Sequence, residues 1–315
     1  MTVKSVAFKP VDLRVDFAGG AMPVTENTNP VFSWAAVHSG KNQKQTGYRI
    51  TAERNGCVIW DSGYVESGEQ AAVYSGEPLQ NNDLIKWRLV LTDKDGVDSI
   101  AAEQSFVVSF GKCFDTTWIA PSDYEQRDVN YFKKSFSVTK QVKRAVLSVC
   151  GLGFHEVYFN GNRLDEGYFQ PVFANYDKLM YYCVLQISGE CFSEMNSIGI
   201  VLADGWRNNK GDWSVQMLKN HPVPMFGEQV LGARLDIYYS DGTCEAVTTD
   251  DSWSVIKTPA RSHLFEGEQY DETYTSREKR AILTQKPNGI LRPQTCPPEK
   301  LQERYKPVSA ISCAG

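Results

Sequence analysis

Short stretches of alternating apolar and polar residues, separated by tight-turn dipeptides, recur along almost the whole chain of 315 residues. Valine, isoleucine, tyrosine and phenylalanine dominate them, which is typical of half-buried β-strands. Asn-Gly and Asp-Gly pairs favour the type I′ turns of hairpins. These pairs stand at residues 55–56, 95–96, 160–161 and 241–242. The pattern predicts an all-β chain with short strands.

The length suggests two domains, at about 100–200 residues each. A boundary between two sets of strand candidates falls near residues 111–117. The first set has the length and strand number of an immunoglobulin-like or fibronectin-type-III-like sandwich, and Trp34 and Trp87 are expected in its core. The second set has more strands and favours a larger, jelly-roll-like sandwich. We therefore predict two tandem β-sandwiches, over residues 1–112 and 113–280.

Residues 281–315 have a different composition, with prolines at positions 287, 293, 297, 298 and 307. Proline-rich stretches favour extended linkers. Residues 306–312 then resemble the opening strand of a further unit, and one strand cannot bury its apolar side chains alone. The sequence predicts a linker and the first strand of a missing following domain.

Charge and cysteine usage narrow the class of protein. The net charge is −5, and no block rich in lysine or arginine occurs, so a nucleic-acid partner is not expected. No apolar run approaches the ~20 residues that span a membrane. The eight cysteines form no Cys-x-x-Cys pair, and the first ten residues do not form a leader. These features predict reduced thiols and a cytoplasmic protein without a membrane partner.

Motifs for common chemistry are missing from the sequence: the glycine-containing stretch 151–156 lacks the third glycine of a nucleotide-binding loop, and the four histidines are isolated. Glycoside hydrolysis needs two carboxylates across a sugar. The candidates for such a pair are Asp165, Glu166, Asp204, Asp212, Glu266, Glu268, Asp271 and Glu272. A solvated loop explains the first two residues, and a polar edge strand explains the last four better than an acid and base pair does.

The most unusual stretch, residues 203–213, follows an apolar strand candidate. The stretch contains tryptophan rings, which can stack on the C–H surface of a sugar, and amide, carboxylate and guanidinium groups, which can bind sugar hydroxyls. The sugar-binding candidates are Asp204, Trp206, Arg207, Asn208, Asn209, Asp212 and Trp213. The alternative is that Trp206 attaches the loop to the core while the polar side chains form turns. Both readings stay open at the level of sequence.

A series of motifs in a fixed order resembles the N-terminal region of bacterial α-L-rhamnosidases, glycoside hydrolase family 78. The first set resembles the leading fibronectin-like domain and lies at 29–34, 45–50, 59–63 and 87–91. The second resembles the β-sandwich domain that follows and lies at 118–120, 131–136, 153–161, 175–178, 202–206, 233–242 and 267–271. Residues 292–298 resemble the crossing into the next β-domain.

The resemblance implies no catalytic residue in this chain. In that family the acid and base carboxylates lie in a later (α/α)₆ barrel, near an Asp-Cys-Pro-Gln-Arg-Asp-Glu motif that this sequence lacks. Some members hold a calcium-dependent rhamnose-binding module with an Asp-Asn pair where this chain has Leu152 and Gly153. Since a leucine side chain offers no oxygen to Ca²⁺, neither a metal nor another cofactor is expected.

Three hypotheses follow. The first is a non-catalytic accessory region that supports the catalytic barrel of an α-L-rhamnosidase and contacts sugar. The second is a free-standing, lectin-like protein that binds an L-rhamnose-containing glycan. The third, an active hydrolase in this chain alone, conflicts with the missing barrel. The implied partners are therefore carbohydrate and the catalytic domain of a full-length enzyme.

Overall fold

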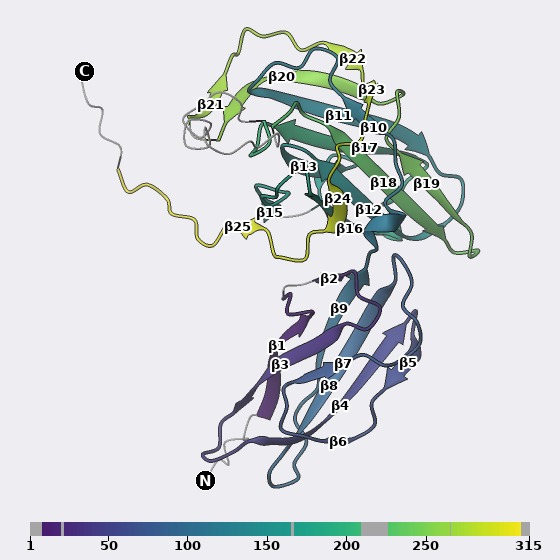
Figure 1. Cartoon of the computed structure of the whole chain (residues 1–315), viewed down its shortest axis with the longest axis vertical. Helices are drawn as coiled ribbons and strands as arrows, with labels where there is room; N and C mark the ends of the chain where they lie inside the picture. Colours follow the sequence, from purple (N-terminus) through teal and green to yellow (C-terminus); the bar gives the residue numbers. More distant parts are fainter. Residues whose placement is uncertain (1–7, 20–21, 165–166, 209–225, 265, 310–315) are drawn as a thin grey trace.

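The protein is described here by a computed structural model, which covers residues 8–19, 22–164, 167–208, 226–264 and 266–309. These ranges hold 25 β-strands, two 3-10 helices (η1, Gly111–Cys113; η2, Gly189–Cys191) and no α-helix (Figure 1). The prediction of an all-β fold with two tandem sandwiches is confirmed. None of the helices in the described ranges is long and apolar enough to cross a membrane.

The first sandwich packs the sheet β1-β3-β7 against the sheet β2-β9-β8-β4-β5, with β6 beside β4. Its strands are β1 (Phe8–Val15), β2 (Val24–Thr25), β3 (Val31–His38), β4 (Gln45–Arg54), β5 (Cys57–Asp61), β6 (Val65–Glu66), β7 (Ala71–Val73), β8 (Leu84–Asp93) and β9 (Ala102–Val108). Trp34 and Trp87 are buried, as predicted, and Phe32 stacks on Trp87 with ring centroids 4.5 Å apart. Aromatic packing between the two sheets therefore forms this core.

The second sandwich consists of two larger sheets, β23-β10-β18-β12-β16-β24 with β19 beside β18, and β14-β13-β17-β11-β20-β21 with β22 beside β20. Its strands include β10 (Trp118–Ala120), β11 (Asp128–Ser137), β12 (Val142–Gly151), β13 (Phe154–Phe159), β14 (Asn162–Arg163), β16 (Leu179–Ser188), β17 (Met195–Ala203), β18 (Leu231–Tyr239), β19 (Cys244–Thr248), β20 (Ser254–His263), β21 (Gly267–Tyr270) and β22 (Glu278–Arg280). Leu147, Phe132 and Trp253 lie in the core between the sheets.

The predicted turn dipeptides connect neighbouring strands. Asn55 and Gly56 join β4 to β5, and Asn160 and Gly161 join β13 to β14; all four have positive φ. Asparagine and glycine adopt this left-handed region at low cost, which is why they specify type I′ hairpins. The turn chemistry therefore fixes the register of these hairpins.

The end of the second sandwich lies beyond the predicted boundary at residue 280. β23 (Ile282–Thr284) pairs with β10, and β24 (Ile290–Pro293) pairs in parallel with β16. β25 (Glu299–Lys300) pairs with β15 (Gly167–Tyr168). Residues assigned to a linker from their prolines thus belong partly to the sheets. Proline is compatible with the end of an edge strand, where no ladder bond requires its missing N–H group.

Candidate functional site

The candidate loop begins where the buried strand β17 ends, at Ala203, and β17 lies between β13 and β11 in its sheet. Asp204, Trp206, Arg207 and Asn208 are described by the structure. The other three candidates lie outside the described residues: Asn209, Asp212 and Trp213.

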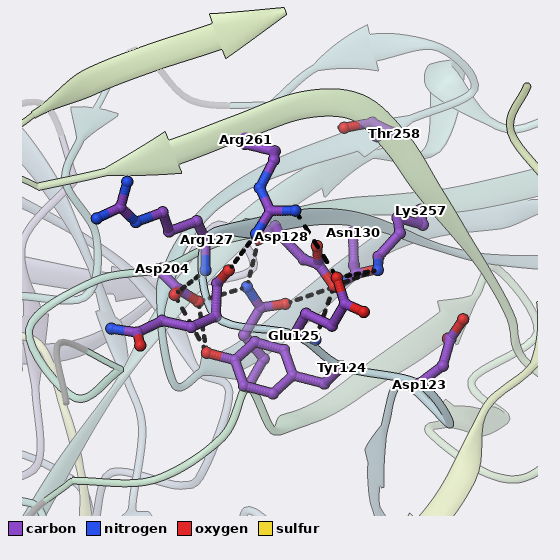
Figure 2. A network of polar contacts seen from close by, with 12 residues as sticks. Asp123, Tyr124, Glu125, Arg127, Asp128, Asn130, Asp204, Lys257, Thr258 and Arg261 are labelled. Atoms are coloured by element: carbon purple, nitrogen blue, oxygen red, sulfur yellow. Dashed lines mark hydrogen bonds and ion pairs between the residues drawn. The ribbon is translucent and has the colours of Figure 1, made fainter. Parts of the chain in front are cut away.

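The carboxylate of Asp204 is buried and accepts hydrogen bonds from three residues (Figure 2). The Tyr124 hydroxyl donates to Oδ1 at 2.9 Å, the Arg127 backbone N–H to Oδ2 at 2.6 Å, and the Gln229 Nε2 to Oδ1 at 2.9 Å. Burial raises the pKa of Asp204, and the donors partly oppose this effect. Both carboxylate oxygens thus bind the protein itself.

The turn that Asp204 holds is strained. Arg127 has a φ of 78°, a region that residues with a Cβ atom rarely adopt. Its backbone N–H nevertheless points at Asp204, and its carbonyl accepts a bond from the Ser262 N–H at 2.9 Å. Asp204 therefore fixes the segment that precedes β11 against the end of β17.

Gln229 extends this arrangement into a buried polar network. Its Nε2 also donates to the Asp128 carbonyl at 2.7 Å, and its Oε1 accepts from Asn130 Nδ2 at 2.9 Å. The Asp128 carboxylate, also buried, pairs with Lys257 at 2.8 Å. A buried polar network rigidifies a structure when all of its groups have hydrogen-bond partners. The side chains around Gln229 have such partners, so we interpret the network as structural. We did not predict Tyr124, Gln229, Asp128 or Asn130 from the sequence.

Asn208 and Arg207 also have protein partners. Asn208 is buried, its Nδ2 donates to the carbonyls of Leu152 and Gly227 at 3.2 and 3.0 Å, and its Oδ1 accepts from the Gly205 N–H at 3.0 Å. Arg207 donates from Nη1 to the Glu228 carbonyl. Burial lowers the pKa of its guanidinium. These contacts agree with the interpretation in which the polar side chains shape the turn.

Trp206 differs from its neighbours because it belongs to an exposed aromatic surface, defined here as Phe173 and Trp206. Phe169 is also exposed, and its ring packs against Phe154. Phe169 and Phe173 are 59% and 53% exposed, and Trp206 is 37% exposed. The Phe173 ring packs edge-on against Trp206, with centroids 5.6 Å apart. Large exposed aromatic groups of this kind often mark contact surfaces.

The remaining acid and base candidates do not form a second site among the described residues. Glu266 pairs with Arg127 at 2.8 Å, Asp271 binds Thr273 within its own turn, and β21 is exposed throughout, as an edge strand is. Asp165 and Glu166 lie outside the described residues. No group of three metal-ligating side chains occurs in the described ranges, and Leu152 is fully buried.

His155, on β13, is the one histidine with a strongly shifted pKa among the described residues. It is buried, and neither ring nitrogen makes a hydrogen bond of good geometry, although the Gly151 backbone lies nearby. Burial lowers the pKa of His155 to about 4. The imidazole is therefore neutral at physiological pH and is buried inside the second sandwich.

Both sandwiches match known family models. Residues 10–111 match the Rha78A-like, N-terminal immunoglobulin domain, and residues 140–303 match the α-L-rhamnosidase N-terminal domain. The tandem arrangement is thus that of the N-terminal part of a rhamnosidase. The chain belongs to the α-L-rhamnosidase N-terminal domain family, which confirms the predicted resemblance.

Curated and solved relatives agree with this assignment. An α-L-rhamnosidase from Alteromonas sp. (strain LOR) is 26% identical over 96% of this chain and 36% of its own length. One from Formosa agariphila is 24% identical over 79% of this chain and 30% of its own. The solved α-L-rhamnosidase from Dictyoglumus thermophilum is 25% identical with a TM-score of 0.78, covering 97% of this chain and 37% of that one. The chain spans about a third of these relatives.

Proposed function

We propose that this chain is a non-catalytic accessory region of an α-L-rhamnosidase, which supports the catalytic barrel of the full-length enzyme. The single observation that carries the proposal is that both sandwiches match N-terminal rhamnosidase domains, over residues 10–111 and 140–303, while the chain covers 36% of the length of the Alteromonas sp. relative. β25, the last strand of the described chain, pairs antiparallel with β15, with Gly167 opposite Lys300. In a longer enzyme, the polypeptide after β25 would leave the second sandwich at the Gly167 end of β15.

Several apolar side chains after β25 support the same proposal. Leu301, Tyr305 and Val308 are exposed, and the chain runs away from the second sandwich here (Figure 1). Exposed apolar residues in an extended segment gain free energy when a partner covers them. The proposed partner is the following part of the rhamnosidase. A cytoplasmic location is part of this proposal, and it is supported by the described cysteines, which form no disulfide with one another.

Reading the gene past codon 315 tests the accessory role. An open frame that continues into a barrel with paired carboxylates, or an adjacent gene that encodes one, is the expected result. A stop codon followed by unrelated sequence would contradict the accessory role and favour the free-standing sugar-binding protein.

The sugar-binding alternative rests on the exposed ring of Trp206. We expect L-rhamnose to leave the indole resonance of Trp206 unchanged in the isolated chain, because Asp204, Arg207 and Asn208 already bind protein groups. An NMR titration to high millimolar sugar measures this. Saturable shifts of backbone amide resonances near residue 206 that Trp206→Ala weakens, while Trp60→Ala in the first sandwich leaves them intact, would establish the sugar site instead.

A further inference from the structure

The two sandwiches meet through buried polar contacts as well as through the connecting chain. Ser109, just after β9, shares a hydrogen bond of 2.9 Å with the Tyr182 hydroxyl of β16, and both residues are buried. Asn82 of the first sandwich donates from Nδ2 to Asp236 at 2.9 Å and to the Tyr238 hydroxyl at 3.0 Å. Such contacts favour one relative orientation, because any other would leave buried polar groups unpaired.

Tyr182, which makes one of these polar contacts, also belongs to a buried apolar cluster. Phe114, in the connecting segment, stacks on Tyr182 with ring centroids 4.9 Å apart and an interplanar angle of 5°. Leu291 of β24 belongs to the same buried cluster. The cluster therefore joins three parts of the chain: the connecting segment, the second sandwich and β24.

β24 contacts both sandwiches. On one side it pairs with β16, and the Gln294 N–H donates to the Tyr182 carbonyl at 2.8 Å. On the other side, a Cβ atom at Gly111 would lie only 2.0 Å from the Leu291 carbonyl oxygen. Arg292 pairs with Glu26, just after β2, at 3.0 Å. Only glycine at position 111 allows this approach of the two backbones.

We propose that β24 is a strap that locks the two sandwiches into one rigid unit. The exposed Arg292–Glu26 pair contributes little, since such pairs are worth about 0–1 kcal/mol. The lock depends on burial of Leu291 against Phe114 and Tyr182, and on the close approach to Gly111. The strap acts on the segment that leaves the first sandwich, because Gly111 and Phe114 lie in that segment and Tyr182 lies in the second sandwich. The inference does not depend on the accessory role.

Gly111→Ala tests the strap in the whole chain. The methyl group collides with the Leu291 carbonyl, so β24 must move away from η1. Residual dipolar couplings from NMR report the alignment of each sandwich. The wild type should fit one alignment tensor for both sandwiches, and Gly111→Ala should need two. Calorimetry should show one unfolding transition splitting into two.

Gly189→Ala is the matched control, since a Cβ atom there lies 2.0 Å from the Val142 carbonyl oxygen, within the second sandwich. It should destabilise that sandwich but keep the single tensor. Leu291→Ala, which leaves the backbone free to pair, is the second test variant and should also separate the tensors. Two tensors in the wild type, or one tensor in a folded Leu291→Ala protein, would overturn the proposal.

Discussion

Replacing Asp204 by alanine should lower the free energy of unfolding by about 3–5 kcal/mol, because each orphaned buried donor costs about 1–3 kcal/mol. The variant removes the acceptor for Tyr124, Arg127 and Gln229 together. It also removes the hydrogen bond that holds the strained turn at Arg127 in place. Chemical denaturation, followed by tryptophan fluorescence to which the buried Trp253 contributes, measures the change.

Glu268→Ala is the control for this prediction. Glu268 is exposed on β21, so its loss should change stability by no more than about 0.5 kcal/mol. Equal, small effects of the two substitutions would show that the Asp204 carboxylate is not a structural element, and that the sugar-binding interpretation needs to be reconsidered.

His155 should make the protein lose stability in mild acid. Its pKa is about 4 in the folded chain against an ordinary 6.5, so the unfolded state binds the proton more tightly. Stability from this group is complete above pH 6.5 and is lost as the pH falls toward 4. The loss amounts to about 2 kcal/mol at pH 5 and about 3 kcal/mol below pH 4.

His155→Leu should remove this pH dependence, and at pH 7 it should be neutral or stabilising, because neither ring nitrogen makes a hydrogen bond of good geometry within the part of the chain that the structure describes. Denaturation curves of both proteins between pH 7 and pH 4 give the difference directly. Protonation of Asp204 favours the folded state as the pH falls, since its pKa is raised. This effect is the same in both proteins, so it cancels when their stabilities are compared. Parallel pH profiles would contradict a buried, neutral His155.

The strands and turns could be predicted because their signals are local. Alternation of apolar residues and the Asn-Gly pairs at 55–56 and 160–161 act over a few neighbouring residues. The prolines among residues 281–300 are also a local signal, and they favoured a linker although part of this range lies in β-strands. In the Ile290–Pro293 segment, exposed and buried residues alternate, but proline composition obscured that short strand signal.

The network around Asp204 could not be predicted, because its partners are far apart in the sequence. Tyr124 and Gln229 are separated from Asp204 by 80 and 25 residues. The pairing of β11 with β17 brings Tyr124 to Asp204, and Gln229 comes from the segment before β18 in the other sheet. In the sequence, a single aspartate after an apolar strand gives the same signal whether its carboxylate binds a sugar or the backbone of a turn. Burial decides between these roles, and burial depends on the tertiary fold.

The most direct test of the central proposal is hydrolysis of an aryl α-L-rhamnoside by the isolated chain. We expect no turnover above background, since glycoside hydrolysis needs two positioned carboxylates about 5–9.5 Å apart. The buried Asp204 already binds protein donors, and Glu268 lies on an exposed edge strand. Turnover that disappears in Asp204→Asn or Glu268→Gln protein of unchanged fold would show that the chain is itself a hydrolase.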